Sequence, residues 1–251
     1  MTNQAFFGEP AEIASAVVGA SFTLTGPEAH HAARVKRVAA GESVDILDGE
    51  GCRLSGTVTV ASAESVTLTV DSIGRDPLPE HRIVLVQALA KGDRAELAVE
   101  AATELGVDAV VPWQADRSIV RWRAEKVLKG KAKWEFLVRA ASKQSRRTRV
   151  PDVLDVQDGR GLASWLGGIE QAVVLHEGAA QSLAGHWSRS APTAPGTLAV
   201  VVGPEGGVSP EEIELFAAHG AVAVSLGSNI LRTSTAGPAA ISVLNHLAGR
   251  W

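Results

Sequence analysis

The stretch VVGPEGGVSPEEIELF, residues 201–216, leads from an apolar strand through a glycine-rich turn into a helix. Ser209, Pro210 and Glu212 have the spacing of a helix N-cap, a proline in the first turn and a capping box. Glycine permits positive φ and close backbone approach, so residues 203–207 form either a simple tight turn or a loop that contacts a ligand.

Outward from this stretch, short apolar runs alternate with helical patterns. The apolar runs cover 83–90, 107–113, 172–176, 197–203 and 221–227. The helical patterns cover 94–106, a basic region to about 145, 210–220 and 235–249. This alternation predicts an α/β domain with a parallel sheet covered on both faces, in which ligands bind beyond the carboxyl ends of the strands.

The N-terminal part has a different pattern. Runs at 43–49, 52–61 and 65–71 alternate β-branched and polar residues, and residues 26–38 have helical spacing. We therefore predict a small β-barrel domain over residues 1–72. Prolines, a glycine and charges predict a linker over 73–82, and the α/β domain then covers 83–251.

Composition limits the classes of function. The single cysteine, Cys52, excludes an internal disulfide and a cysteine-based zinc site, and the histidines have no metal-ligand spacing, so no metal is expected. The absence of a signal sequence and of a membrane-length apolar run predicts a cytoplasmic protein with no membrane contact. The net charge is −4, yet residues 121–149 hold eleven Lys/Arg against two Glu. That segment is either a polyanion-binding surface or a solvated helix face.

The common nucleotide-binding fingerprints are missing. The chain contains neither GxxxxGK[ST] nor a GxGxxG after a first strand, which argues against a P-loop and a conventional dinucleotide fold. The glycine loop alone is weak support for a ligand site. A second strand end, at 226–233, carries another unusual loop, and the two together are more specific.

VVGPEGGVSPEEIELF followed by VSLGSNILRTSTA (224–236) resembles the paired C-terminal motifs of the bacterial small-subunit ribosomal RNA uridine-N3 methyltransferases, which belong to the SPOUT class. Further blocks at 28–51, 91–122 and 139–153 are similar to the same family, so the resemblance covers nearly the whole chain. It implies an N-terminal PUA-like β-barrel and a C-terminal SPOUT α/β domain with a deep trefoil knot over about 198–249 and a mostly parallel sheet. It also implies S-adenosylmethionine as cofactor, small-subunit ribosomal RNA or the assembled subunit as substrate, and a homodimer.

The resemblance also assigns residues. The cofactor would be bound by His176, Glu177, Gly203, Pro204, Glu205, Gly206, Gly207, Leu226, Gly227, Ile230, Leu231, Arg232 and Thr233. RNA would be bound by Arg34, Arg37, Gln144, Arg146, Arg147 and Arg149. The sequence departs from the family pattern at Ala5, Lys143, Asn229 and Ser234.

Methylation at N3 of uracil requires loss of the N3 proton and stabilisation of charge on the flanking carbonyl oxygens. Arg232 is the expected catalytic residue for the second task, unless it only pairs with a carboxylate. Glu205 is a candidate to bind the ligand or accept the proton, or it is a loop carboxylate held by backbone N–H groups. His176 is a ligand contact or a core histidine. Trp122 and Trp134 stack on bases, or they only pack in the protein.

Two alternatives to the methyltransferase stay open. One is a non-catalytic RNA-binding protein that has lost cofactor binding. The other is a metabolic α/β enzyme that uses another nucleotide, against which the basic segment argues. For assembly, residues 235–251 are apolar on more than one face, which predicts that a second copy covers part of this helix.

Overall fold

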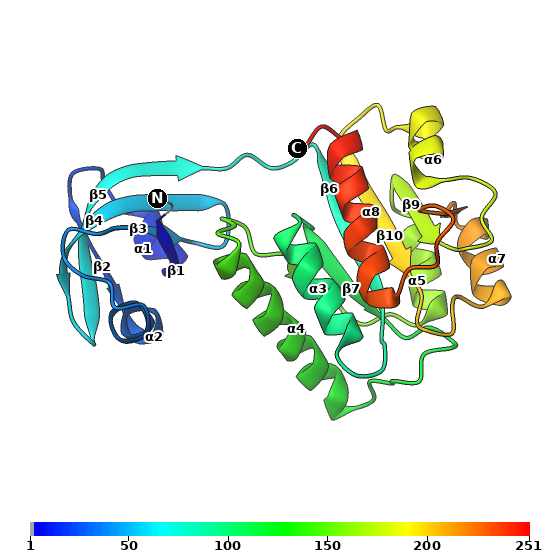
Figure 1. Ribbon diagram of the computed structural model, residues 1–251, viewed down its shortest axis with the longest axis horizontal. Helices are drawn as coiled ribbons and strands as arrows, with labels where there is room; N and C mark the ends of the chain where they lie inside the picture. The colour runs from blue at the N-terminus through cyan, green and yellow to red at the C-terminus, as the bar shows by residue number, and fades with distance from the viewer. Residues whose placement is uncertain (1–2) are drawn as a thin grey trace. The chain divides into compact units, whose positions relative to one another are not determined.

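The computed structural model describes residues 3–251 and divides into two compact units (Figure 1). The first unit comprises Met1–Leu78 together with Ser142–Val150, and the second comprises Pro79–Ala141 and Pro151–Trp251. This division differs from the predicted one in two respects. The last strand of the first unit continues to Arg75, into the expected linker, and the chain returns to the first unit at residues 142–150.

The first unit is a curled β-sheet with short helices. Its strands are β1 (Gln4–Phe7), β2 (Ser21–Thr25), β3 (Ser43–Leu47), β4 (Cys52–Ala61) and β5 (Ser65–Arg75), and a short helix α1 (Pro10–Ala14) follows β1. The strand order is β1-β3-β4-β5-β2, with β1 parallel to β3 and the other pairs antiparallel. Along the first part of β4, alternate residues are buried, as one face of the sheet covers the core.

The predicted helix at 26–38 has an unusual form. An α-helix, α2 (Gly26–His30), continues into a π-helical turn, η1 (His31–Val35). Ala29 and Ala32 are buried against the sheet core, whereas the predicted RNA contacts Arg34 and Arg37 are exposed. The small side chains thus hold the helix close to the barrel and leave its basic face in solvent.

The second unit is a three-layer α/β structure. Its strands are β6 (His81–Ala88), β7 (Ala109–Trp113), β8 (Asp152–Val153), β9 (Gln171–Leu175), β10 (Gly196–Val202) and β11 (Val222–Val224). Its helices are α3 (Arg94–Glu104), α4 (Glu125–Gln144, which ends in the first unit), α5 (Gly159–Leu166), α6 (Leu183–Ser190), α7 (Pro210–Ala218) and α8 (Thr233–Leu247). Every described strand pair in the order β11-β9-β10-β6-β7-β8 is parallel, which confirms the predicted sheet.

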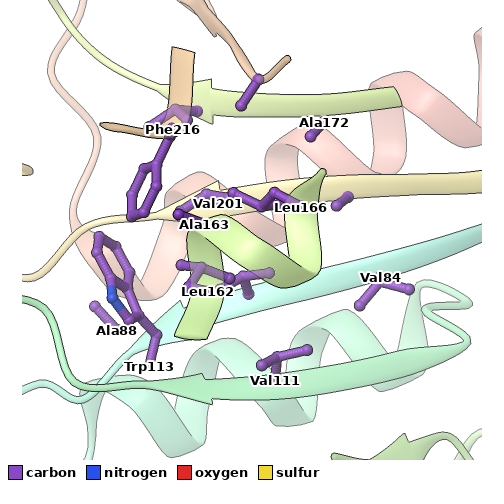
Figure 2. Packing of buried hydrophobic residues seen from close by; sticks show 14 of the residues in the cluster. Val84, Ala88, Val111, Trp113, Leu162, Ala163, Leu166, Ala172, Val201 and Phe216 are labelled. Atoms are coloured by element: carbon purple, nitrogen blue, oxygen red, sulfur yellow. The ribbon is translucent and has the colours of Figure 1, made fainter. Parts of the chain in front are cut away.

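Each face of this sheet has its own helical layer. Val84, Val86 and Val111 lie in a core cluster with residues of α5 and α7, and Trp113 meets Phe216 edge-on at 5.4 Å between ring centroids (Figure 2). The α3–α8 pair lies on the opposite face (Figure 1). Leu85 of β6 points to that face, because its methyl groups lie against Gly237 of α8. Because successive strand residues point to opposite faces, both layers draw on the same strands. The short helices α5 and α6 were not predicted from sequence.

Helix α8 returns across the sheet after β11 has paired at its edge. A Cβ at Gly237 would lie 2.8 Å from a Leu85 methyl, so glycine allows the helix to approach β6 closely. Here the resemblance placed the trefoil knot. The helix packs against α3, β6, β10 and α6, and Leu244 is buried inside the unit. The chain itself therefore covers much of the apolar arc for which a second copy was expected. Among residues 3–251, no helix is long and apolar enough to cross a membrane.

Candidate functional site

A pocket of about 570 Å³ lies where β9, β10 and β11 end. Each of these neighbouring parallel strands continues into a loop that lines it, so the loops meet at one edge of the sheet. The lining includes every residue predicted to bind the cofactor: His176, Glu177, Gly203, Pro204, Glu205, Gly206, Gly207, Leu226, Gly227, Ile230, Leu231, Arg232 and Thr233. Segments more than fifty residues apart in sequence thus form one cavity of a size typical for small-molecule sites.

The GPEGG loop (203–207) forms one side of the pocket and is held by several hydrogen bonds. The Gly207 N–H donates to the Pro204 carbonyl at 2.9 Å, and Gly207 has φ +72°, so the segment is a tight turn. The Arg117 guanidinium donates to the Gly206 carbonyl at 3.0 Å. Residues 203–207 are therefore a tight turn, and the same turn lines the pocket.

The predicted capping box fixes the exit of this loop. The Ser209 hydroxyl caps α7, and the buried Glu212 carboxylate accepts from the Ser209 N–H at 3.1 Å. The other carboxylate oxygen of Glu212 accepts from the Asp116 N–H at 2.7 Å. One side chain thereby ties the start of α7 to the chain segment after β7.

Glu205 points to the other side of the loop, toward the start of α3. Its Oε1 accepts from the Lys91 N–H at 3.1 Å and from the Arg94 guanidinium at 2.8 Å. Partial burial acts to raise the pKa of this carboxyl, but hydrogen bonds from the Glu205 and Lys91 N–H groups and from Arg94 outweigh it, so the pKa lies below its usual value. A carboxylate in this state is a weak proton acceptor at neutral pH. The geometry favours the alternative of a loop carboxylate held by backbone N–H groups.

A buried polar network joins the GPEGG loop to α8. The Thr233 hydroxyl donates to the Gly203 carbonyl at 2.8 Å and accepts from Gln87 Nε2 at 2.9 Å. Since the carbonyl can only accept, the hydroxyl proton must point to Gly203, and the Gln87 amide must present its N–H group to Thr233. Gln87 is fully buried. This network fixes the ends of β6, β10 and the first turn of α8 against one another.

The LGSNILR loop (226–232) forms the other side of the pocket and is much less constrained. Within residues 3–251, the side chains of Ser228, Asn229 and Arg232 have no hydrogen bond or ion pair to another residue, and Ile230 is 82% exposed. Arg232 is the N-cap residue of α8, and its side chain is exposed. Its guanidinium is thus available to a ligand. The sequence left open that Arg232 only pairs with a carboxylate, and among the described residues no such pair is present.

His176 lies between the two loops at the end of β9. Its N–H donates to the Val224 carbonyl at 3.0 Å, and its Nδ1 accepts from the Gly178 N–H at 3.0 Å. The accepting Nδ1 assigns the ring proton to Nε2, which leaves one donor for a ligand. The half-buried ring is therefore both packed and part of the pocket wall.

The predicted RNA contacts all belong to the first unit, where they differ in exposure. Gln144 is exposed, and Arg146 and Arg147 are partly buried. Arg149 donates from its guanidinium to the carbonyls of Glu50 and Asp76, the latter at 2.8 Å. This pairing holds residues 142–150 on the barrel, so Arg149 has a structural role that the sequence did not indicate.

Sequence reasoning missed the residues that hold the GPEGG loop. Arg94 and Arg117 follow β6 and β7, at the same edge of the sheet as the end of β10. This order of parallel strands could have indicated them. Gln87 also carried a signal, because it is the polar residue in the apolar run IVLVQALA (83–90). Its partner could not be read from the sequence, since Thr233 lies 146 positions away.

Comparisons with known families assign both units to RNA methyltransferases. Residues 76–245 match an RNA methyltransferase domain, and residues 24–71 match an RNA methyltransferase PUA domain. The chain is 40% identical over 239 residues to ribosomal RNA small subunit methyltransferase E of Mycobacterium bovis, covering 93% of this chain and 89% of that protein. Against the protein of the same name from Bacillus subtilis, the identity is 30% over 230 residues, with 90% of each chain covered.

Solved structures give the same assignment. A ribosomal RNA small subunit methyltransferase E from Neisseria gonorrhoeae, bound to S-adenosyl methionine, has a TM-score of 0.82 at 28% identity, with 98% of both chains covered. A putative methyltransferase from Legionella pneumophila in complex with the bound cofactor SAM has a TM-score of 0.82 at 26% identity and the same coverage. The fold is thus the PUA-like barrel and SPOUT α/β domain that the resemblance implied.

Proposed function

This chain belongs to the ribosomal RNA small subunit methyltransferase E family, and from that premise we propose that it transfers the methyl group of S-adenosylmethionine to N3 of a uridine in small-subunit ribosomal RNA. The observation that carries the proposal is the pocket in which all thirteen predicted cofactor residues meet. Because ribosomal RNA is the proposed substrate, we place the enzyme in the cytoplasm and in ribosome biogenesis.

The residues present suit this cofactor. Glycines at 203, 206 and 207 let backbone groups approach a ligand, and a side chain at Gly203 would collide with Val208. Ile230 and Leu231 offer exposed apolar surface, while His176 and Glu177 offer polar groups at the end of the neighbouring strand β9. When bound, S-adenosylmethionine supplies an electrophilic methyl group, and the protein's task is to bind and orient the two reactants.

We assign the charge-stabilising role to Arg232. Attack by uracil N3 places negative charge on the flanking carbonyl oxygens, and a guanidinium that is always cationic can donate to them. Arg232 is exposed at the start of α8, where the helix dipole also favours negative charge. Glu205 acts as a positioning residue in this proposal, because its carboxylate is already occupied by Lys91 and Arg94.

RNA binding is proposed for a set of exposed and partly buried side chains of the first unit, most of them basic. Arg34 and Arg37 project from η1 and the turn after it, and Gln144 lies near the end of α4. Lys143 joins these two segments, because its ammonium pairs with Glu28 of α2 at 2.6 Å. Arg146 and Arg147 complete the proposed surface. Arg149 holds their segment on the barrel through its hydrogen bonds to the carbonyls of Glu50 and Asp76.

A homodimer belongs to the same proposal. Ala239, Val243 and Leu247 form a half-exposed line along α8 at a spacing of four residues. A two-fold contact through this line would bury it. Leu247→Asp is the appropriate disruption, since Leu244 packs inside the unit and its replacement would unfold the chain. Sedimentation of Leu247→Asp as a monomer, with wild type a dimer, supports this contact.

The test of the function is methyl transfer to ribosomal RNA that lacks the modification. Small subunits, and the RNA extracted from them, are incubated with labelled S-adenosylmethionine, and their nucleosides are analysed by mass spectrometry. We expect 3-methyluridine, and the two preparations identify whether the assembled subunit or free RNA is the substrate. A methyl group on another atom or base overturns the N3 assignment. Absence of S-adenosylmethionine binding by calorimetry would favour the non-catalytic RNA-binding alternative.

A further inference from the structure

The sequence left two roles open for Trp134 of α4 and for Trp122, which precedes this helix: stacking on bases or packing within the protein. Trp134 is fully buried, and the half-buried Trp122 meets it edge-on at 5.5 Å between ring centroids. Trp122 also covers Gly130, where a Cβ would lie 2.5 Å from the indole. These two rings therefore pack the helix onto its unit, and of the two alternatives the structure selects packing for Trp134.

The opposite face of α4 exposes a different aromatic residue. Phe136 is 75% exposed, although a phenyl ring of this size normally gains by burial. Its neighbours one helical turn away on either side, Ala132 and Ala140, are both exposed alanines. No long side chain at these two positions covers the ring, so the flat face of Phe136 is open to a partner.

The surroundings of this ring are basic. Residues 121–141 hold seven Lys/Arg against two Glu. Lys129 and Lys133 lie on the same helical face as Phe136, seven and three residues before it. Their ion pairs, with Glu125 at 3.6 Å and Glu96 at 2.6 Å, leave both side chains more than half exposed, so the two lysines still contribute to the local potential.

We propose that Phe136 is a stacking platform for an unpaired base of the RNA substrate, with Lys129 and Lys133 binding the adjoining phosphates. An open aromatic ring beside cations is a combination by which proteins bind single-stranded nucleic acid. A second copy of this chain fits the face less well, because two basic helices would repel each other. The inference rests on the proposed RNA methyltransferase function and adds to it an RNA contact on the second unit.

The test uses matched variants at Phe136 and a labelled single-stranded oligouridylate of about ten nucleotides. Phe136→Ala should weaken binding by about 5- to 100-fold, the range that stacking of a base supplies. Phe136→Leu should bind as weakly as Phe136→Ala, because it keeps an apolar side chain but loses the aromatic face. Phe136→Trp should bind at least as tightly as wild type. Since Phe136 is exposed, none of these changes should disturb the fold.

Salt dependence and a control separate stacking from charge. Phe136→Ala should leave the slope of log affinity against log salt unchanged, whereas Lys133→Ala should reduce it by roughly 0.7 for the lost phosphate contact. Leu128→Ala is the matched control, since Leu128 is 74% exposed on the same helix but is not aromatic. It should bind oligouridylate like wild type.

Unchanged oligouridylate affinity in Phe136→Ala overturns the proposal. Wild-type affinity in Phe136→Leu also overturns it, because any apolar side chain would then suffice. Loss of self-association in Phe136→Ala, with RNA affinity kept, would show a contact between copies instead. If wild type forms no 3-methyluridine yet the variants follow the predicted order, the proposed function fails and the stacking platform stands.

Discussion

The two loops that line the pocket differ sharply in how the protein holds them. The GPEGG loop is fixed by its own turn, by Arg117, by the Arg94–Glu205 pair and by the capping box behind it. The LGSNILR loop has no comparable side-chain contacts among the described residues, and it exposes Ile230 and Arg232. One side of the site is therefore preorganised, and the other is free to adapt to what binds.

This difference matches the tasks that we propose for the two sides. A cofactor that is bound in every cycle gains affinity from a rigid cradle, because less ordering is required on binding. The LGSNILR loop also lines the cofactor pocket, but through Arg232 it must in addition meet the RNA, and a less constrained segment can close over both reactants. Thr233 connects the two loops. It is the first residue of α8, directly after the LGSNILR loop, and its hydroxyl donates a hydrogen bond to the Gly203 carbonyl of the GPEGG loop.

The largest effect is expected on the free side. Arg232→Ala should lower kcat for methyl transfer by about 100- to 1000-fold, because it removes the donor to the developing charge. The free energy of unfolding should change by less than about 0.5 kcal/mol, since the side chain is exposed. Single-turnover transfer and urea unfolding measure the two quantities. Arg232→Lys keeps the charge but loses the planar guanidinium with its paired N–H donors, so its kcat should lie between those of wild type and Arg232→Ala. A change in KM alone would assign Arg232 to binding.

The next effect breaks the junction between the loops. Thr233→Val should lower the free energy of unfolding by about 2–4 kcal/mol, because it leaves the Gly203 carbonyl and the Gln87 N–H group unpaired in a buried site. S-adenosylmethionine affinity should fall with it, as measured by calorimetry on folded protein. Thr233→Ser keeps the hydroxyl and is the control. Equal stability of Thr233→Val and wild type would show that the two loops are held independently.

A smaller effect is expected at the outer anchor of the GPEGG loop. Arg94→Ala should weaken S-adenosylmethionine binding by no more than about fivefold, because the pair is partly exposed and such pairs contribute about 1 kcal/mol or less. Glu205→Gln is the matched variant, and it should have a similar effect because it removes the charge but keeps the shape. A loss of binding far beyond this range would mean that Arg94 contacts the ligand directly.

The same pair gives a prediction for pH. The pKa of Glu205 is lowered in the folded protein, so its stabilising contribution is present above the ordinary pKa of glutamate, about 4.3, and is lost as pH falls through the lowered value. Affinity for S-adenosylmethionine should therefore stay constant from neutral pH down to about 5. In Arg94→Ala the pKa of Glu205 should be lowered less, so the affinity for S-adenosylmethionine should begin to fall at a higher pH than in wild type. A wild-type decline between pH 7 and 6 that is absent from Glu205→Gln would contradict the lowered pKa of Glu205.

The smallest effect is expected from an apolar side chain of the free loop. Ile230→Ala should weaken S-adenosylmethionine binding by about threefold, as measured by calorimetry, because an exposed side chain gains only partial burial on binding.

Hydrogen exchange compares the two loops directly. Amides of 226–232 should exchange quickly in the free protein and slowly with cofactor, whereas the Gly207 amide should be protected in both. Equal protection of both loops in the free protein would remove the contrast.

Much of the fold could be predicted from the sequence because it is locally encoded. The parallel strands follow from continuous apolar runs, and the start of α7 follows from Ser209 and Glu212. Short or irregular elements were missed, as with α5, which has only eight residues, two of them glycines. The π-helical turn at His31–Val35 was also missed, because its amino acids are those of an ordinary helix.

By itself, the sequence determined that an all-β pattern precedes an α/β pattern, that unusual loops follow two of the strands, and to which family the motifs of these loops belong. Only the tertiary structure decided which partners those residues have. It placed Arg149 on the carbonyls of Glu50 and Asp76, occupied Glu205 with Arg94, buried Trp134 and left Phe136 exposed. The physical reason is that hydrophobic periodicity and capping act within a few residues, whereas hydrogen-bond partners and burial depend on segments that meet only when the chain has folded.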